Sequence, residues 1–325
     1  MDIILGNAIM WLVQPITAAY ALAAIGIALH FGFTGLLNFG QAVYMAVGAY
    51  GFAISVKVFH LNFWAAVAVA IICSVLMSFI LGIPTLRLRS DYLAIVTIAA
   101  AEVFRYIVST TANQPVTGGP QGLNQYSNDF YAMNPLPQGF EWKFWVWDLN
   151  GDDIFMMAIA WALVAVFAIL MRYMVRSPWG RVIKGIREDE DAVRSLGKNV
   201  YAYKMQSLVV GGLMGTVAGI IFVLPTSVQP GNYGTTLTFF VWTILLLGGA
   251  STVFGSVVGA MIFWSLLSLT GDLLSNGVDS GVITFLTQQQ VGGIRFILVG
   301  LGLMLLVIFR PQGIFGNKKE LQFNA

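Results

Sequence analysis

The sequence predicts an all-α, polytopic membrane protein, on three observations. Of the 325 residues, 58% are hydrophobic and 10% are charged, whereas charged residues make up about 25% of a soluble domain. Several apolar runs reach about 20 residues, long enough to cross a hydrocarbon core of roughly 30 Å. The 35 glycines suit helices that pack closely in lipid, where small residues line the contacts. We therefore expect residues 1–325 to form a single transmembrane domain.

About nine membrane segments are expected, and two of them are unusual. The seventh has about fourteen residues, or about 21 Å as a helix, so it is predicted to be tilted, broken or re-entrant. The second opens with the polar, glycine-rich stretch TGLLNFGQ, so it is also open to interruption. In chain order the segments are 8–30, 36–56, 62–83, 91–110, 153–175, 205–224, 236–249, 255–274 and 293–310.

Lysine and arginine near the ends of the segments predict the orientation, because cytoplasmic loops are enriched in them. With nine segments, three basic stretches lie on the same side: the 176–204 loop, the 84–90 link with Arg87 and Arg89, and the 311–325 tail with Lys318 and Lys319. The 176–204 loop carries Arg176, Arg181, Lys184, Arg187, Arg194, Lys198 and Lys204. We expect these three stretches in the cytoplasm and the N-terminus outside.

The 111–152 loop is predicted to be external, since Lys143 is its one basic residue. It is rich in Asn, Gly, Pro, Tyr and Trp. One interpretation is a solvated cap in which Trp142, Trp145 and Trp147 anchor the headgroup region. The other is a docking surface for an external partner, and the two are compatible.

Motifs for chemistry are missing from the sequence. It has no GxxxxGK[ST] phosphate loop and no GxGxxG dinucleotide motif. No HExxH, CxxC or paired-histidine spacing indicates a metal site, and Cys73 is the single cysteine. We expect no cofactor in this chain and no enzymatic activity, which leaves transport or partner scaffolding as function classes.

Polar side chains within the segments are the candidates for a translocation pathway, because charge at membrane depth is costly. Glu102 and Arg105 share one helix face at i and i+3. They are interpreted either as a mutually neutralised pair near the outer end or as part of a polar path. Asn38, Gln41 and Tyr44 recur at three-residue spacing and are predicted to share a helical face. They either make interhelical hydrogen bonds or supply neutral groups to a pathway.

The stretch 185–204 gathers eight of the 32 charged residues. Four consecutive acids, Glu188, Asp189, Glu190 and Asp191, suit the first turn of a helix, where free N–H groups favour negative charge. Gly197 suits the position just after a helix end. A short helix over about 189–196 is predicted, with Ala192, Val193 and Leu196 as a small apolar face. A two-turn helix is not stable alone, so it packs either on the membrane surface or in a protein socket. The acidity of this helix argues against packing on the membrane surface, because the inner leaflet is itself negatively charged.

The sequence RSPWGRVIKGIREDEDAVRSLGKNVYAYK (176–204) resembles the cytoplasmic coupling loop of ABC importer permeases. DAVRSLG (191–197) is similar to the EAA-x3-G signature of that family, with Asp for Glu and Val for the second Ala. The residues around this signature are similar to the corresponding residues of the branched-chain amino acid importer permeases, of the M-type rather than the H-type. Further matching segments are GLLNFGQAVYMAVGAY, RLRSDYLAIVTIAAAEVFR, TGGPQGL, LLGGASTVFGSVVGA and FRPQGIFG.

This resemblance implies the ABC importer permease fold in a bacterial cytoplasmic (inner) membrane. It implies an H-type permease subunit as partner, two cytoplasmic ATPase subunits that hold ATP and Mg²⁺, and an external or periplasmic solute-binding protein. The acidic helix, with Glu188 to Val193, Leu196 and Gly197, would sit in a groove on one ATPase. Thr117, Gly118 and Gly119 are the candidates for external docking.

Two questions of function stay open at this point. Leucine, isoleucine and valine are the expected substrates, with urea or another amide as the alternative, since permeases of urea importers share much of this sequence pattern. A stand-alone secondary carrier is the alternative from another class. No segment has an isolated carboxylate near its centre, which such a carrier usually needs.

Overall fold

Helices dominate the chain, which a computed structural model describes over residues 2–87, 90–137, 139–144, 147–283 and 286–316. The predicted all-α class is confirmed. The helices that correspond to predicted segments two to nine are α3 (Gln41–Lys57), α4 (Phe63–Thr85), α5 (Ser90–Ser109), α8 (Gly151–Arg176), α11 (Val200–Val223), α12 (Thr235–Gly248), α13 (Val253–Asp279) and α14 (Gln288–Phe309).

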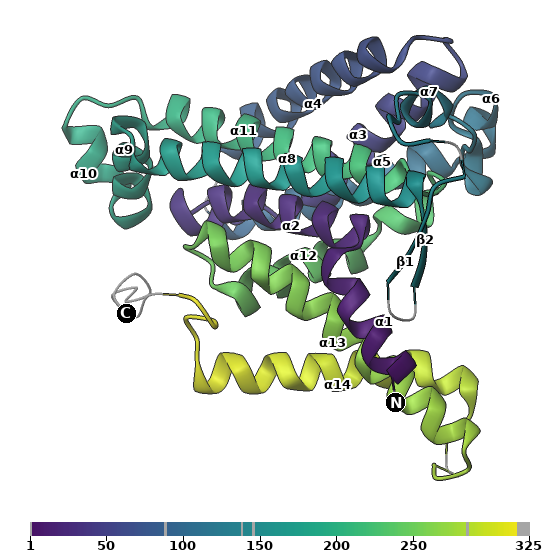
Figure 1. Ribbon diagram of the computed structural model, residues 1–325. Helices are drawn as coiled ribbons and strands as arrows, with labels where there is room; N and C mark the ends of the chain where they lie inside the picture. Colours follow the sequence, from purple (N-terminus) through teal and green to yellow (C-terminus); the bar gives the residue numbers. More distant parts are fainter. Residues whose placement is uncertain (1, 88–89, 138, 145–146, 284–285, 317–325) are drawn as a thin grey trace.

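Within the described residues, seven helices are long and apolar enough to cross a membrane. α12 has 14 residues and α3 has 17, so both are shorter than a full span. Both nevertheless run beside the long helices (Figure 1). The short seventh segment is therefore confirmed as a short helix, and the count of nine crossings stays a prediction.

The first predicted segment, 8–30, is not one continuous helix. The structure has α1 (Asp2–Val13) and α2 (Pro15–Ile27), and α2 continues as a π-helix, η1 (Ala28–Phe33). Pro15 has no backbone N–H and forces the preceding residue out of the helical region. Gln14 accordingly has an extended backbone, with φ −54° and ψ 146°. α1 therefore leaves at an angle and packs along α13 (Figure 1).

The core is the bundle of α2, α3 and α11, in which backbones approach closely at glycines. A Cβ on Gly48 would lie 2.2 Å from the carbonyl oxygen of Thr216, and one on Gly219 would lie 2.0 Å from that of Met45. Both distances are below any real contact, so only glycine allows α3 and α11 to pack this tightly. Close approach of this kind is how helices associate in lipid.

Short helices occupy the two ends of the bundle (Figure 1). One end carries α9 (Pro178–Glu188) and α10 (Glu190–Ser195), and we call it the α10 end. The other, the hairpin end, carries η2 (Thr111–Asn113), α6 (Gln114–Thr117), η3 (Gly119–Gln121), α7 (Asn128–Ala132), β1 (Glu141–Phe144), β2 (Trp147–Asn150) and η4 (Pro230–Tyr233). β1 and β2 form an antiparallel hairpin that pairs Glu141 with Asn150.

Non-helical turns meet at the α10 end. The second predicted segment, 36–56, starts later than expected: residues 34–40 are not helical, and α3 then runs without a break from Gln41. The chain after α14 folds back here: the N–H groups of Ile314 and Phe315 donate to the carbonyl oxygens of Leu247 and Gly248 at 2.9 and 3.0 Å. Three of the basic residues that predict the orientation, Arg89, Lys318 and Lys319, lie outside the described residues. So does Trp145, one of the predicted headgroup anchors.

Candidate functional site

The predicted acidic helix is present as α10, within one residue of its expected bounds. Asp189 is the N-cap, and its carboxylate accepts a hydrogen bond from the Ala192 N–H at 2.9 Å. At the other end Gly197 has φ +75°. The N–H groups of Gly197 and Lys198 donate to the carbonyl oxygens of Arg194 and Val193 at 3.0 and 3.4 Å. This is the Schellman arrangement, so local sequence determines both ends of α10.

The remaining acids of α10 and its N-terminal neighbour are paired within the loop. Glu190 accepts from Lys204 at 2.5 Å and from Arg194 at 2.9 Å. Asp191 also pairs with Arg194, at 3.1 Å, and Glu188 pairs with Arg187 at 2.5 Å. Since Lys204 belongs to α11, the Glu190–Lys204 pair ties α10 to the first turn of a core helix. The acids thus fix the orientation of α10.

The predicted apolar face of α10 is divided between two surfaces. Val193 is half-buried and packs over Gly185 of α9, where a Cβ would lie 3.1 Å from a Val193 methyl group. Val193 therefore packs within the loop, and the predicted contact of this apolar face with another protein stays a prediction. Ala192 and Leu196 are exposed, and Leu196 is 78% exposed. Leu196 thus lies on the surface at the end of α10, beside charges of α10 that are paired within the loop.

α9, which the sequence analysis missed, joins α10 to the core. Ser177 caps its N-terminus by accepting from the Gly180 N–H at 3.3 Å, and Pro178 is its first residue. This Ser-Pro pair is a helix-start signal. Its buried face carries Ile183 and Ile186.

Arg187, the last basic residue of α9, makes the connection to the end of the first core helix. Its guanidinium donates from Nη1 to the carbonyl oxygen of Gly32 in η1 at 2.5 Å, and its side chain is 10% exposed. Its aliphatic carbons pack on Gly35, where a Cβ would lie 3.1 Å from Cγ. Gly35 has φ +75°, which L side chains rarely adopt. Arg187 therefore ties the end of α9 to the backbone of η1.

Asn38, Gln41 and Tyr44 are fully buried inside this chain. The prediction that they share one helical face is wrong for Asn38, which lies in the non-helical turn before α3. Its amide contacts Nδ1 of His30 at 3.0 Å, and Nε2 of the same ring lies 3.3 Å from the Leu208 carbonyl oxygen. His30 is thus a polar residue of the core that the sequence analysis did not select.

Gln41 joins the three core helices. Its Nε2 donates to the carbonyl oxygens of Ala23 on α2 and Gly211 on α11, at 3.2 and 3.3 Å. Among the described residues, Gln41 Oε1 is buried without a hydrogen-bond partner. The donor side of Gln41 therefore makes interhelical hydrogen bonds, and any contact with a solute requires the helices to separate. The pathway role of Asn38, Gln41 and Tyr44 stays a prediction.

Glu102 and Arg105 form a close ion pair on α5. Arg105 Nη2 lies 2.7 Å from Glu102 Oε2, and Nε donates to the same oxygen at 2.8 Å. The other oxygen, Oε1, accepts from the backbone N–H of Thr235 at 3.1 Å. Thr235 begins α12, so the carboxylate sits at a helix N-terminus, where negative charge is stabilised. These contacts support the structural interpretation, and a pathway role for the pair stays a prediction.

The predicted docking residues Thr117, Gly118 and Gly119 form a turn at the hairpin end. Thr117 is buried, and its hydroxyl contacts the carbonyl oxygens of Val108 and Asn113 at 2.8 and 3.0 Å. Gly118 has φ +77°, and a Cβ there would lie 1.9 Å from the carbonyl oxygen of Gly122. Thr117 and Gly119 are buried, so they hold the loop in shape and present little surface to a partner.

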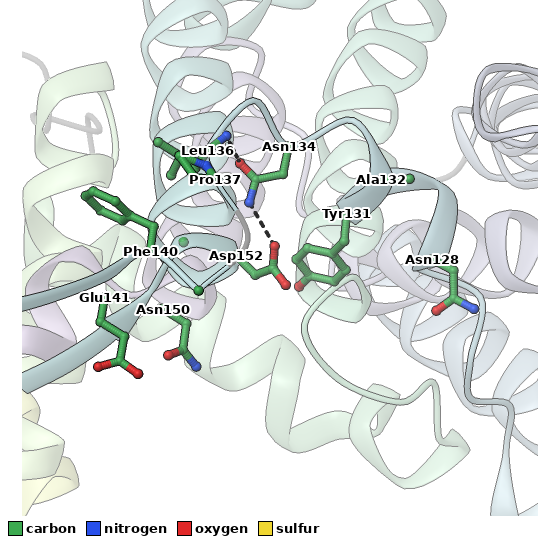
Figure 2. A pocket seen from close by; sticks show the side chains of 12 residues that line it. Asn128, Tyr131, Ala132, Asn134, Leu136, Pro137, Phe140, Glu141, Asn150 and Asp152 are labelled. Carbon is green, nitrogen blue, oxygen red and sulfur yellow. Dashed lines mark hydrogen bonds between the residues drawn. The ribbon is translucent and has the colours of Figure 1, made fainter.

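A polar pocket of about 640 Å³ lies at the hairpin end, between α7, the hairpin and the start of α8 (Figure 2). The Asn134 amide crosses it and donates to Asp152 Oδ1 at 2.8 Å. Burial, together with the nearby carboxylates of Asp152 and Asp153, raises the pKa of Tyr131. Its hydroxyl therefore remains a donor at neutral pH. None of these residues belongs to a motif in the sequence, which is why they were not selected.

Comparison with known proteins decides the family. Residues 8–308 match the family described as "Branched-chain amino acid transport system / permease component". The chain belongs to this permease family. No solved structure matches it.

Individual relatives favour the M-type within this permease family. The chain is 28% identical to the high-affinity branched-chain amino acid transport system permease protein LivM of Escherichia coli (strain K12), over 93% of this chain and 69% of that protein. It is 23% identical to a probable LivM of Methanocaldococcus jannaschii, over 92% and 91% of the two chains. It is also 23% identical to LivH of Escherichia coli (strain K12), over 92% of each chain. The predicted M-type resemblance is confirmed.

Proposed function

We propose that this permease is the membrane-spanning subunit of an ATP-driven importer of leucine, isoleucine and valine. Its partners are an H-type permease, two ATPase subunits that bind ATP and Mg²⁺, and an external solute-binding protein. The names of its relatives support the substrate class, and the match to both LivM and LivH supports a second permease subunit.

The observation that carries the proposal is the arrangement of α10. A helix of six residues is fixed at both ends by capping, its charges are paired within the loop, and Leu196 is left exposed at its tip. A hydrophobic knob on a preoriented helix is suited to a groove on another protein. We assign Ala192 and Leu196 to the contact with an ATPase, with Glu188 to Asp191, Val193 and Gly197 holding the helix in position.

The structure supports a route for the movement into the membrane domain. Dimerisation of the ATPases on ATP binding would displace α10, which is tied to α11 through Glu190 and Lys204. Because α9 is bound to Gly32 through Arg187, the same displacement reaches η1 and α2. These are the elements that enclose the buried polar residues His30 and Gln41.

The orientation follows from the basic residues of the α10 end. We place the α10 end and the last described residues after α14 in the cytoplasm of a bacterial inner-membrane protein, and the start of α1 and the hairpin end outside. The external solute-binding protein then docks on the hairpin end. The Thr117–Gly119 turn shapes that surface, and the pocket beside Tyr131 and Asp152 forms part of it.

The contact role of α10 is tested with Leu196→Asp in the four-subunit complex. We expect this change to weaken association of the ATPases at least tenfold, because it places a charge in an apolar contact. Ser195→Asp is the control, since Ser195 is an exposed neighbour on the same helix. Normal association and coupled uptake with Leu196→Asp would refute the assignment of α10.

The substrate is tested by calorimetry on the purified solute-binding protein, with leucine, isoleucine, valine and urea as ligands. Binding of the branched-chain amino acids alone supports the proposal, and binding of urea alone overturns the substrate class. In liposomes, solute flux through this chain alone, driven by an ion gradient, would overturn the ATP-driven mechanism in favour of a secondary carrier.

A further inference from the structure

A groove of about 560 Å³ opens at the α10 end, between α8, α9 and the start of α13. Along α8 its lining residues recur at three- and four-residue spacing, so they share one face of that helix. They are Trp161, Val164, Ala165, Ala168, Ile169, Arg172, Val175 and Arg176. This face spans about 22 Å along the helix axis.

The lining changes from apolar to basic along that length. Trp161, Val164 and Ile169 form the part of the α8 wall farther from the α10 end, and Phe254 and Val257, from the first turns of α13, add apolar surface nearer that end. The part nearer the α10 end carries the cations Arg172, Arg176 and Lys184, the last from α9. None of the described lining residues is acidic. The groove therefore matches an amphiphile with an anionic head and an apolar tail.

The two arginines lack partners within the part of the chain that the structure describes. Neither Arg172 nor Arg176 makes a hydrogen bond or an ion pair there, and both are exposed. Lys184 contacts the face of Phe33 at 5.6 Å, which leaves its charge available to an anion. In the neighbouring stretch 187–204, by contrast, the acids are paired with Arg187, Arg194 and Lys204. The unpaired cations converge on the groove.

We propose that this groove binds an anionic phospholipid of the cytoplasmic leaflet, with its phosphate held by Arg172, Arg176 and Lys184 and an acyl chain along the apolar wall of α8. Basic pockets between helices on the cytoplasmic side are suited to anionic headgroups, and each nearby cation contributes attraction. The proposal rests on the proposed orientation, which places the α10 end at that leaflet. A bound lipid would brace α8 against α9 and the start of α13, next to the coupling helix.

The test is native mass spectrometry of the assembled, delipidated complex, titrated with phosphatidylglycerol or phosphatidylcholine. We expect preferential binding of phosphatidylglycerol, and a loss of about tenfold or more in the triple variant Arg172→Gln, Arg176→Gln, Lys184→Gln. Arg181→Gln is the matched control, because Arg181 is an exposed cation of α9 that does not line the groove. Ala165→Trp fills the apolar wall without changing charge, and it should also lower binding.

Four results would overturn the site. Equal binding of the two lipids would remove the role of charge, and an equal loss with Arg181→Gln would remove the role of the groove. Glycerol phosphate competing as well as phosphatidylglycerol would show that the apolar wall contributes nothing. A photo-crosslinker at Ile169 should capture lipid, whereas capture of the partner permease would identify the groove as a protein interface. Because these measurements do not involve solute uptake, their failure is separate from failure of the proposed function.

Discussion

The loops at the two ends of the bundle use their sequence motifs differently. At the α10 end, the motif residues Ala192 and Leu196 are on the surface, and the charged residues of α10, Glu190, Asp191 and Arg194, are paired. At the hairpin end, the motif residues Thr117 and Gly119 are buried, and the polar pocket is lined by residues of no motif. Residues of a recognisable motif can therefore lie on the surface or form the support beneath it. Only burial and hydrogen bonding separate the two cases.

The largest effect is expected from Gly118→Val, which tests whether the turn at the hairpin end is a structural support. A side chain there would be strained at φ +77° and would overlap the carbonyl oxygen of Gly122. We expect a loss of roughly 3 kcal/mol or more in stability, measured as a lower melting temperature and folded yield on size-exclusion chromatography. Gly231→Ala is the control, since a Cβ at Gly231 meets nothing within 4 Å. Wild-type stability in Gly118→Val would mean that the turn is not a support.

A smaller effect is expected from Thr117→Val in the same turn. The change removes a buried hydroxyl that contacts the carbonyl oxygens of Val108 and Asn113, at a cost of roughly 1–3 kcal/mol. Thermal unfolding of the purified complex measures it, with the exposed Thr111→Val as control. If Thr117 instead contacts the solute-binding protein directly, stability will be unchanged and affinity for that protein will fall.

The smallest effect is expected from Gly197→Ala at the α10 end. Gly197 also has positive φ, at +75°, but a Cβ there meets nothing within 4 Å. The cost is therefore only conformational, about 1 kcal/mol, and it is local to α10. Hydrogen exchange should become faster at the amides of 192–198, while the melting temperature of the complex stays the same. A global loss as large as that of Gly118→Val would remove the contrast between the two loops.

The sequence predicted what local chemistry determines. α10 was placed within one residue because its caps, Asp189 and Gly197, lie within the segment itself. The short α12 was likewise predicted closely from a bounded apolar run. Pro15 and the Ser177–Pro178 pair carried equally local signals for the break after α1 and the start of α9, so those two errors were avoidable.

Long-range contacts could not be predicted in the same way. The contact of Gln41 with Gly211 joins residues 170 positions apart, and that of Arg187 with Gly32 joins residues 155 apart. The three-residue spacing also gave a wrong prediction for Asn38, which does not share a helical face with Gln41 and Tyr44. The turn that contains Asn38 is not helical, so helical periodicity does not apply there. The burial that separates support from contact at Thr117 likewise depends on the packed fold.

The central claim is that movement of α9 and α10 enters the core through Arg187. The most direct test is the ratio of solute imported to ATP hydrolysed, in proteoliposomes that contain the complete importer with Arg187→Ala. The change removes the hydrogen bond to the Gly32 carbonyl oxygen. Loss of a buried charged hydrogen bond costs roughly 1.5 kcal/mol, so we expect this ratio to fall about tenfold. ATP hydrolysis should be retained, and Arg187→Lys should restore part of the ratio. Arg181→Ala, on the exposed side of the same helix, should leave the ratio unchanged. A wild-type ratio in Arg187→Ala, at normal folded yield, would contradict the claim.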